Sequence, residues 1–280
     1  MQAAQADTAR QAPRMQRAQG LGRISTATLA DGSTRLDRLY QDGCAKIRLP
    51  RTHVPAMQAV LINTAGGLTG GDRLEWHATA APGTRLVLTT QTCERIYRST
   101  GGAASVATAL RVGSGAHVDW LPQETILFDK AVLERTLDVD LEEKASATLL
   151  EAVILGREAM GEDALSASLV DRWRIRREGR LLHAEQTGLE ANEPIPRHSS
   201  FLLSGARAFA TLLHVSEDAE RRVDELRRAI PDGSLAGASV IGEKLVFRAL
   251  APSGFALRKI LAPAIAVLSG AGSLPRLWSI

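Results

Sequence analysis

Short segments in which hydrophobic and polar residues alternate follow one another through the first two thirds of the chain. From about Thr34 to Gln186 they are separated by Gly, Pro-Gly and Asp-Gly breaks, at intervals of roughly 10 to 15 residues. Alternation with a period of two is typical of strands that bury one face. The pattern therefore predicts a predominantly β body over about residues 24–200. The clearest predicted strands are 73–80, 84–90, 105–112, 132–141 and 147–155.

The last third of the chain contains two helical patterns. Residues 216–230 (SEDAERRVDELRRAI) begin with a serine N-cap, carry acids in the first turn and arginines in the last, and stop before Pro-Asp-Gly. A second helix is predicted over residues 254–268, with Ser253 as its cap, and Pro263 predicts a kink or an early break. Strand-like residues 238–247 lie between the two helices.

The domain organisation follows from length and composition. A β-rich chain of 280 residues can bury a core in one domain, which we expect over residues 21–280. The first 20 residues are polar and rich in Ala and Gln without an apolar stretch, which predicts a disordered tail and no secretory signal. The most apolar run, 260–268, is interrupted by Pro263 and too short for a bilayer. We expect no membrane association and a cytoplasmic location.

Charge and cysteine content narrow the function classes. Lys plus Arg total 34 against 31 Asp plus Glu, and aromatic residues are only 4%, so nothing indicates a nucleic-acid surface. The arginine-rich stretch 172–180 alternates Arg with Trp173 and Ile175, which predicts one wet and one buried strand face. The two cysteines, Cys44 and Cys93, show no zinc-type spacing and require no oxidising compartment.

The densest glycine block is NTAGGLTGGD, residues 63–72, after the apolar run 57–62. Glycines cluster where the backbone needs a positive φ or a close approach to another segment. A phosphate-binding loop is disfavoured because the GK[ST] ending is absent and a strand, not a helix, is predicted to follow.

Acidic residues offer the main candidate chemistry. Glu124 and Asp129, within LPQETILFD, could serve as paired carboxylates of a β-helical glycoside hydrolase. The alternative is a structural role, in which each pairs with Arg95, Arg98 or a backbone donor. The six histidines are scattered without a metal-binding spacing, and no Ser/His/Asp or Cys/His nucleophile motif occurs.

Four blocks together resemble the UreD family, also called UreH. The resemblance covers about residues 24–280, with the blocks in the family's order and rough spacing. The four blocks are NTAGGLTGGD (63–72), TTQTCERIYRS (89–99), LPQETILFD (121–129) and LGREAMGE (155–162). Two departures are Cys93, where the family often has a small residue, and Lys130, where it often has glycine. We therefore interpret Cys93 as structural.

The resemblance implies both a fold and a role. The fold would be mainly β, an irregular β-helix-like stack of sheets with a small two-helix part near the C-terminus. The role would be that of a non-catalytic accessory protein that binds UreF, the GTPase UreG and the urease apoprotein, and assists nickel insertion into the urease active site. No cofactor would be bound stably, and nickel would be in transit.

A nickel conduit needs sites that are easy to leave. Ni(II) binds nitrogen and sulfur ligands tightly, whereas carboxylates, carbonyls and water form more exchangeable sites. Our hypothesis is that a set of acids lines a water-filled route and that two arginines fix them; the rival is that each is only a fold residue. The set is Asp72, Glu124, Asp129 and Glu162, with Glu94 and Glu158 as weaker candidates and Arg95 and Arg157 as the supporting arginines. The predicted helices 216–230 and 254–268 are candidates for a partner surface, although packing on their own domain is the more common fate of such helices.

Overall fold

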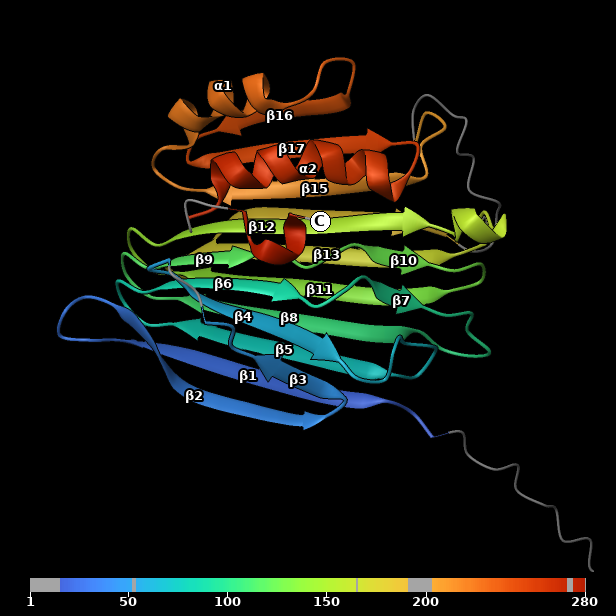
Figure 1. Ribbon diagram of the computed structural model, residues 1–280, viewed down its shortest axis with the longest axis horizontal. Helices are drawn as coiled ribbons and strands as arrows, with labels where there is room; N and C mark the ends of the chain where they lie inside the picture. The colour runs from blue at the N-terminus through green and yellow to red at the C-terminus, as the bar shows by residue number, and fades with distance from the viewer. Residues whose placement is uncertain (1–15, 52–53, 165, 191–202, 271–273, 280) are drawn as a thin grey trace, which may run out of the picture.

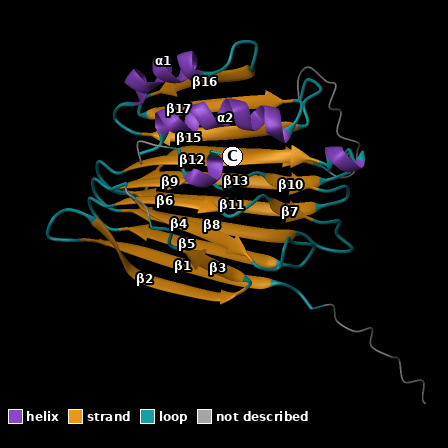
Figure 2. Ribbon diagram, viewed as in Figure 1, coloured by secondary structure: helices purple, strands orange, loops and turns teal. Residues whose placement is uncertain are grey.

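Two stacked β-sheets form the body of the computed structural model, which describes residues 16–51, 54–164, 166–190, 203–270 and 274–279 (Figures 1 and 2). The first is seven-stranded, and its strands are, in spatial order, β14 (Arg180–Leu189), β13 (Ser168–Arg177), β11 (Val132–Leu141), β8 (Ala104–Val112), β5 (Arg73–Ala80), β1 (Gln19–Thr28) and β2 (Thr34–Gly43).

The second sheet is ten-stranded. Its main path runs through β16 (Leu235–Ile241), β17 (Lys244–Ala251), β15 (Ala208–Val215), β12 (Ser146–Leu155), β9 (His117–Trp120), β6 (Arg85–Thr90), β4 (Met57–Asn63) and β3 (Ala45–Arg48). Beside this path the short strand β10 (Thr125–Leu127) pairs in parallel with both β12 and β7 (Glu94–Ile96).

The chain alternates between the sheets and so winds a solenoid of about 4 turns. Successive strands of one sheet are parallel and in register, so equivalent residues of consecutive coils lie side by side. One such row joins Ala78, Leu110, Val139 and Ile175, all of which are buried. The expected irregular β-helix-like fold is therefore confirmed.

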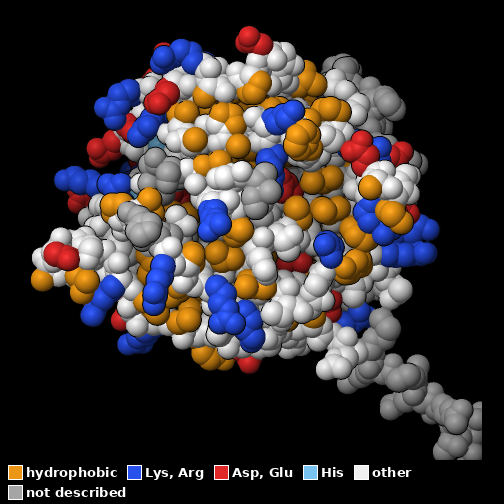
Figure 3. Space-filling model, in the orientation of Figure 1, with side chains coloured by type: hydrophobic (Ala, Val, Ile, Leu, Met, Phe, Trp, Pro, Cys, Tyr) orange, Lys and Arg blue, Asp and Glu red, His pale blue; other side chains and the backbone are white. Residues whose placement is uncertain are grey.

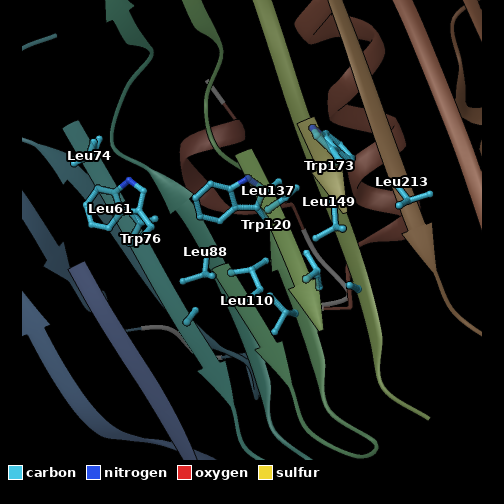
Figure 4. Packing of buried hydrophobic residues seen from close by; sticks show 14 of the residues in the cluster. Leu61, Leu74, Trp76, Leu88, Leu110, Trp120, Leu137, Leu149, Trp173 and Leu213 are labelled. Carbon is cyan, nitrogen blue, oxygen red and sulfur yellow. The ribbon is translucent and has the colours of Figure 1, made fainter. Parts of the chain in front are cut away.

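The core fills the space between the two sheets. Inward residues alternate with outward ones along each strand, as in β13, where Trp173 and Ile175 are buried while Arg172 and Arg174 are exposed. This confirms the prediction that the arginine-rich stretch has one solvent-exposed and one buried strand face. Figure 4 shows side chains from both sheets, among them Leu88, Leu110 and Trp120, meeting in this space.

A second hydrophobic layer lies on the outer face of the ten-stranded sheet. Helices α1 (Ala219–Ala229) and α2 (Gly254–Leu268) cover β12, β15 and β17 there (Figure 1). Leu257 and Leu261 of α2 belong to the same buried cluster as Leu150 and Phe247. Because β12 has neighbours on both faces, nearly all of its residues are buried. No helix in the described part of the chain is long and apolar enough to cross a bilayer.

The five clearest predicted strands are confirmed, two of them at identical bounds and three within one residue at their starts. The predicted tail is shorter than expected, because β1 begins at Gln19 and pairs in parallel with β5. Residues 1–15 of that tail lie outside the described residues. The limit of the β body at residue 200 is also wrong, since β15, β16 and β17 extend the ten-stranded sheet.

The two predicted helices form with small corrections. The first begins at Ala219 with Asp218 at its N-cap, because Ser216 instead accepts a hydrogen bond from the Asp218 backbone nitrogen. The second has the predicted bounds, and Ser253 caps it by accepting from the Ala256 nitrogen. The early break expected at Pro263 is wrong, as the helix continues to Leu268. The predicted strand 238–247 is a hairpin of β16 and β17.

The stacked core gives a stability prediction. Leu137 is fully buried between the sheets, so Leu137→Ala should lower the free energy of unfolding by about 2–5 kcal/mol, through lost transfer energy and a residual cavity. Urea unfolding followed by circular dichroism measures this. The control Leu181→Ala changes a side chain that is 60% exposed and should stay within about 0.5 kcal/mol. Equal effects at the two positions would contradict the assigned core.

Candidate functional site

The four sequence blocks lie together at one end of the ten-stranded sheet. The bridge between Leu68 and Ile96 joins the glycine block to β7, and β7 joins β10 through the pair Leu127 and Ile96. The fourth block follows β12, where the Gly156 nitrogen donates to the Leu127 oxygen at 2.8 Å. Segments far apart in the sequence are thus neighbours because they occupy the same position in successive coils.

The glycine block is required by close contacts. A Cβ at Gly70 would lie 2.2 Å from the Ser99 hydroxyl oxygen and 2.4 Å from the Gly101 carbonyl oxygen. Gly67 has a φ of +148° and packs against Tyr97, so a side chain there would meet both strain and collision. The interpretation of these glycines as close-approach positions is confirmed at both residues.

Glu124 is buried and ion-paired with α2. The Arg258 guanidinium donates to Glu124 Oε2 at 2.8 Å and to Oε1 at 3.2 Å. The Cys93 thiol donates to the same Oε2 at 3.3 Å. The expected partners Arg95 and Arg98 are therefore wrong for Glu124, because α2 brings an arginine from 134 residues away.

The same arginine ties down the C-terminal segment. Arg258 lies 4.9 Å from the Trp278 ring centroid, and it also donates to the Leu277 carbonyl and to Gln123. Trp278 is buried and its indole nitrogen donates to the Leu121 carbonyl at 3.0 Å. The Glu124 carboxylate thus anchors α2 and the chain end to the β body.

Glu94 faces the interior and lines two adjoining cavities. The outer cavity, of about 90 Å³, also has Asn63, Cys93 and Arg95 in its wall. The inner cavity, of about 40 Å³, lies between the sheets. Desolvation raises the pKa of Glu94 to about 7, although a hydrogen bond from Asn63 acts in the opposite direction. Glu94, a weaker candidate from the sequence, is therefore the acid that lines both the outer and the inner cavity.

Three charged residues missed from the sequence lie at the inner cavity or beside it. Arg135 donates to Asp171 at 2.6 Å and forms a close ion pair with Glu151, and all three are buried. Burial opposes the charge on Arg135, but the two carboxylates raise its pKa. Desolvation raises the pKa of Glu151 to about 7 against the attraction of Arg135, and Trp120 donates to its carboxylate at 2.9 Å.

This inner cluster is incompletely hydrogen-bonded. Arg135 Nε and Asp171 Oδ1 are buried without a hydrogen-bond partner among the described residues. Unsatisfied buried polar atoms are costly and point to a polar guest such as water. The sequence does indicate this cluster: Arg135 alternates in step with Leu133 and Leu137, so the period of two places its side chain on the inward face of β11.

The remaining candidate acids hold loops. Asp72 accepts from the Ala18 and Thr69 nitrogens, each at 2.8 Å, and fixes the start of β1 against the glycine block. Glu162 accepts from Arg157 at 2.6 Å and from the Asp129 nitrogen at 3.1 Å. The Arg157 hydrogen bond lowers the pKa of Glu162.

Asp129 accepts from the Ser166 nitrogen at 3.2 Å, which is the backbone partner that the structural alternative allowed. Glu158 and Arg95 are exposed. None of Asp72, Asp129 and Glu162 is in the wall of the two cavities. Within the described residues, no three His, Cys, Asp or Glu side chains form a group that could hold a metal ion.

Comparison with known proteins defines the family. The family model described as "UreD urease accessory protein" matches residues 19–279. The chain belongs to the UreD family of urease accessory proteins. It is 62% identical to "Urease accessory protein UreD" of Chelativorans sp. (strain BNC1), over 95% of each chain. A protein of the same name from Rhizobium johnstonii is 51% identical, over 95% of this chain and 97% of the relative, and one from Agrobacterium fabrum is 47% identical, over 98% and 95%.

Membership confirms the resemblance noted in the sequence. Lys130 has a φ of +61°, in the left-handed region that glycine adopts without strain, so the backbone here would suit the glycine that the resemblance led us to expect. The Cys93 thiol donates to the Glu124 carboxylate, which agrees with the interpretation of Cys93 as a structural residue.

The half-buried Cys93 thiol gives a chemical prediction. Desolvation, together with Glu124, raises the pKa of Cys93 to about 12, so at pH 8 only about one thiol in ten thousand is the reactive thiolate. Iodoacetamide should therefore leave Cys93 unmodified in the folded protein while it alkylates the urea-unfolded chain. Mass spectrometry of the tryptic peptide measures both rates, and similar rates would contradict the assigned environment.

Glu94 gives a pH prediction. Its folded-state pKa of about 7 exceeds the ordinary value of 4.5, so the folded protein holds more protons between these values and loses stability as pH rises. Glu94→Gln removes this loss. The stability difference, variant minus wild type, should increase from pH 4.5 to 7 and level off above 7, as measured by urea unfolding. A flat difference would rule out the raised pKa.

Proposed function

We propose that this protein is a non-catalytic scaffold of urease maturation that binds UreF, UreG and the urease apoprotein and assists nickel insertion. Its membership of the UreD family supports this role, since its relatives are named urease accessory proteins. The proposed place of action is the cytoplasm, and the two free thiols are compatible with a reducing compartment.

The observation that carries the nickel part is the pair of cavities that share Glu94. The outer one reaches exposed residues Gln91 and Arg95, and the inner one reaches the Arg135 and Glu151 pair. A carboxylate at the junction would attract Ni(II) from the outer cavity. We therefore move the proposed route from the stronger candidates of the sequence to Glu94, with Glu151 as the next acid inward.

The donor set suits a cargo rather than a resident ion. Glu94 offers one carboxylate, with Asn63 and Thr90 as neutral oxygen donors in the same wall, and such a site is weak and exchangeable. The Arg135 guanidinium opposes a cation farther in, but Glu151 and Asp171 together offset its charge. A nickel ion that enters would therefore meet only moderate electrostatic attraction and would not be bound tightly.

The hydrolase alternative receives no support from the geometry. Glu124 is bonded to Arg258 and Cys93, whereas Asp129 is bonded to the loop at Ser166, so among the described residues the two carboxylates share no partner. A glycoside hydrolase needs both acids free to face one substrate bond.

The test is activation of co-expressed urease in a strain that lacks its own UreD-family protein. Glu94→Gln keeps the shape but removes the charge, so nickel content and urease activity should fall roughly tenfold, as for loss of a supporting metal-site group. The matched control, Glu134→Gln, changes an exposed glutamate of β11 and should activate urease fully. Full activation by Glu94→Gln would sink the route through Glu94.

Three further variants separate the route from the fold. Asp72→Ala, Glu124→Ala and Asp129→Ala remove hydrogen-bond acceptors of the β body, so each should reduce the amount of soluble protein. Normal accumulation of these variants with inactive urease would favour the original conduit set. If the wild-type chain neither binds UreF nor restores urease activity, the whole proposed function is wrong.

A further inference from the structure

Beyond the N-terminal end of α2 lies a strip of the ten-stranded sheet, at β7 and β10, on which neither α1 nor α2 packs in the part of the chain that the structure describes. In β7, β10 and β12 the residues Ile96, Leu127 and Leu155 point into the core. The alternate row, Arg95, Ile126 and Ile154, therefore lies on the outer face. Ile126 and Ile154 are only half-buried, since α2 covers the neighbouring strands but not this end of β10.

Aromatic and aliphatic side chains extend this strip. Tyr97 and Phe128 follow β7 and β10, and their rings meet edge to face at 5.0 Å. Met160 and Phe255 are each 71% exposed. Gly254, the residue before Phe255, approaches Ile154 closely, since a Cβ on Gly254 would lie 2.4 Å from Ile154 Cδ1.

We call this surface the end patch. It consists of Tyr97, Ile126, Phe128, Ile154, Met160 and Phe255. Figure 3 shows hydrophobic side chains over β7, β10 and the start of α2, on the right of the view, with both Lys or Arg and Asp or Glu side chains around them. Large side chains exposed together on one surface are typical of an interaction site.

The rim of the end patch is basic. Arg157 lies over the Phe128 ring at 4.3 Å, and the Lys259 ammonium lies over the Phe255 ring at 4.5 Å. The nearby acids among the described residues include Glu158, which is exposed, and Glu162 and Asp163, which are paired with Arg157 and Arg207. The exposed cations are Arg95, Arg98, Lys130, Arg157 and Lys259.

We propose that the end patch is the docking surface for an amphipathic helix with acidic flanks, carried by a protein partner. The patch continues the layer that α2 occupies on the same sheet, so a partner helix laid beside α2 would complete that layer. Phe255 and Met160 are exposed, whereas the two isoleucines of the patch and Phe128 are half-buried. We expect the apolar face of a helix to pack on such an uneven surface. The acidic flanks would pair with the basic rim.

This inference rests on the proposed function for the identity of the partner, which it takes to be one of the maturation proteins. It also moves the proposed partner surface away from α1. The apolar face of α1, with Val223 and Leu226, is buried on its own sheet, so only the start of α2 contributes to the patch.

The experiment compares two double variants of the full chain. Phe255→Ser with Met160→Ser removes the exposed centre of the end patch. Leu235→Ser with Ile241→Ser is the matched control on β16, where the side chains are 58% and 63% exposed. Affinities for purified UreF, UreG and urease apoprotein are measured by calorimetry, together with binding to anionic phospholipid vesicles and self-association by sedimentation.

The proposal expects wild type and control to bind one maturation protein equally and the patch variant to bind it at least about tenfold more weakly, equivalent to about 1.4 kcal/mol. Lys259→Glu with Arg98→Glu should also weaken binding and reduce its salt dependence. Unchanged binding by the patch variant overturns the docking surface but leaves the proposed function intact. Wild-type failure to bind any of the three overturns both. Loss of only vesicle binding, or only self-association, assigns the patch to another occupant and overturns the proposal.

Discussion

In-register parallel pairing between coils is the constraint on which the rest of the molecule depends. Each inner strand satisfies its backbone groups with the preceding and following coil, so a residue is fixed beside its counterparts one turn away. A slip by one residue would turn every inward side chain outward. The same register that aligns Ala78, Leu110 and Val139 in the core also aligns the four sequence blocks at one end of the second sheet.

At the ends of the stack antiparallel pairing replaces parallel pairing, and this terminates the series of coils. The parallel series of the first sheet is closed by antiparallel strands, β2 on β1 and β14 on β13, and that of the second sheet by β15 on β12 and β3 on β4. An antiparallel strand adds no further parallel coil and so terminates the parallel series. Helices α1 and α2 then pack on the outer face at one end of the stack, whereas β7 and β10 are among the strands of the same sheet on which, within the described residues, neither helix packs.

Strand positions were predictable from the sequence because period-two alternation is local. The pairing of coils was not, because parallel partners are separated by an entire turn and no sequence repeat marks the turns. The tail boundary failed for this reason: β1 is held by β5, whose residues lie more than 50 positions away. Of the kink or early break expected at Pro263, the early break is wrong, since the helix continues to Leu268 with Leu257 and Leu261 buried.

In the candidate site too, the sequence predicts local features but not contacts between residues far apart in the chain. Acids could be recognised as a group, yet their individual roles depend on which face each strand turns inward. Glu94 pairs with Thr125, whose hydroxyl contacts the buried Arg135, so Glu94 faces the interior cluster. Glu124 meets Arg258 of a helix that the strand pattern cannot locate. Charges that interrupt an inward apolar series, such as Glu151 between Leu149 and Val153, are therefore a better sequence guide to this interior than charges in conspicuous motifs.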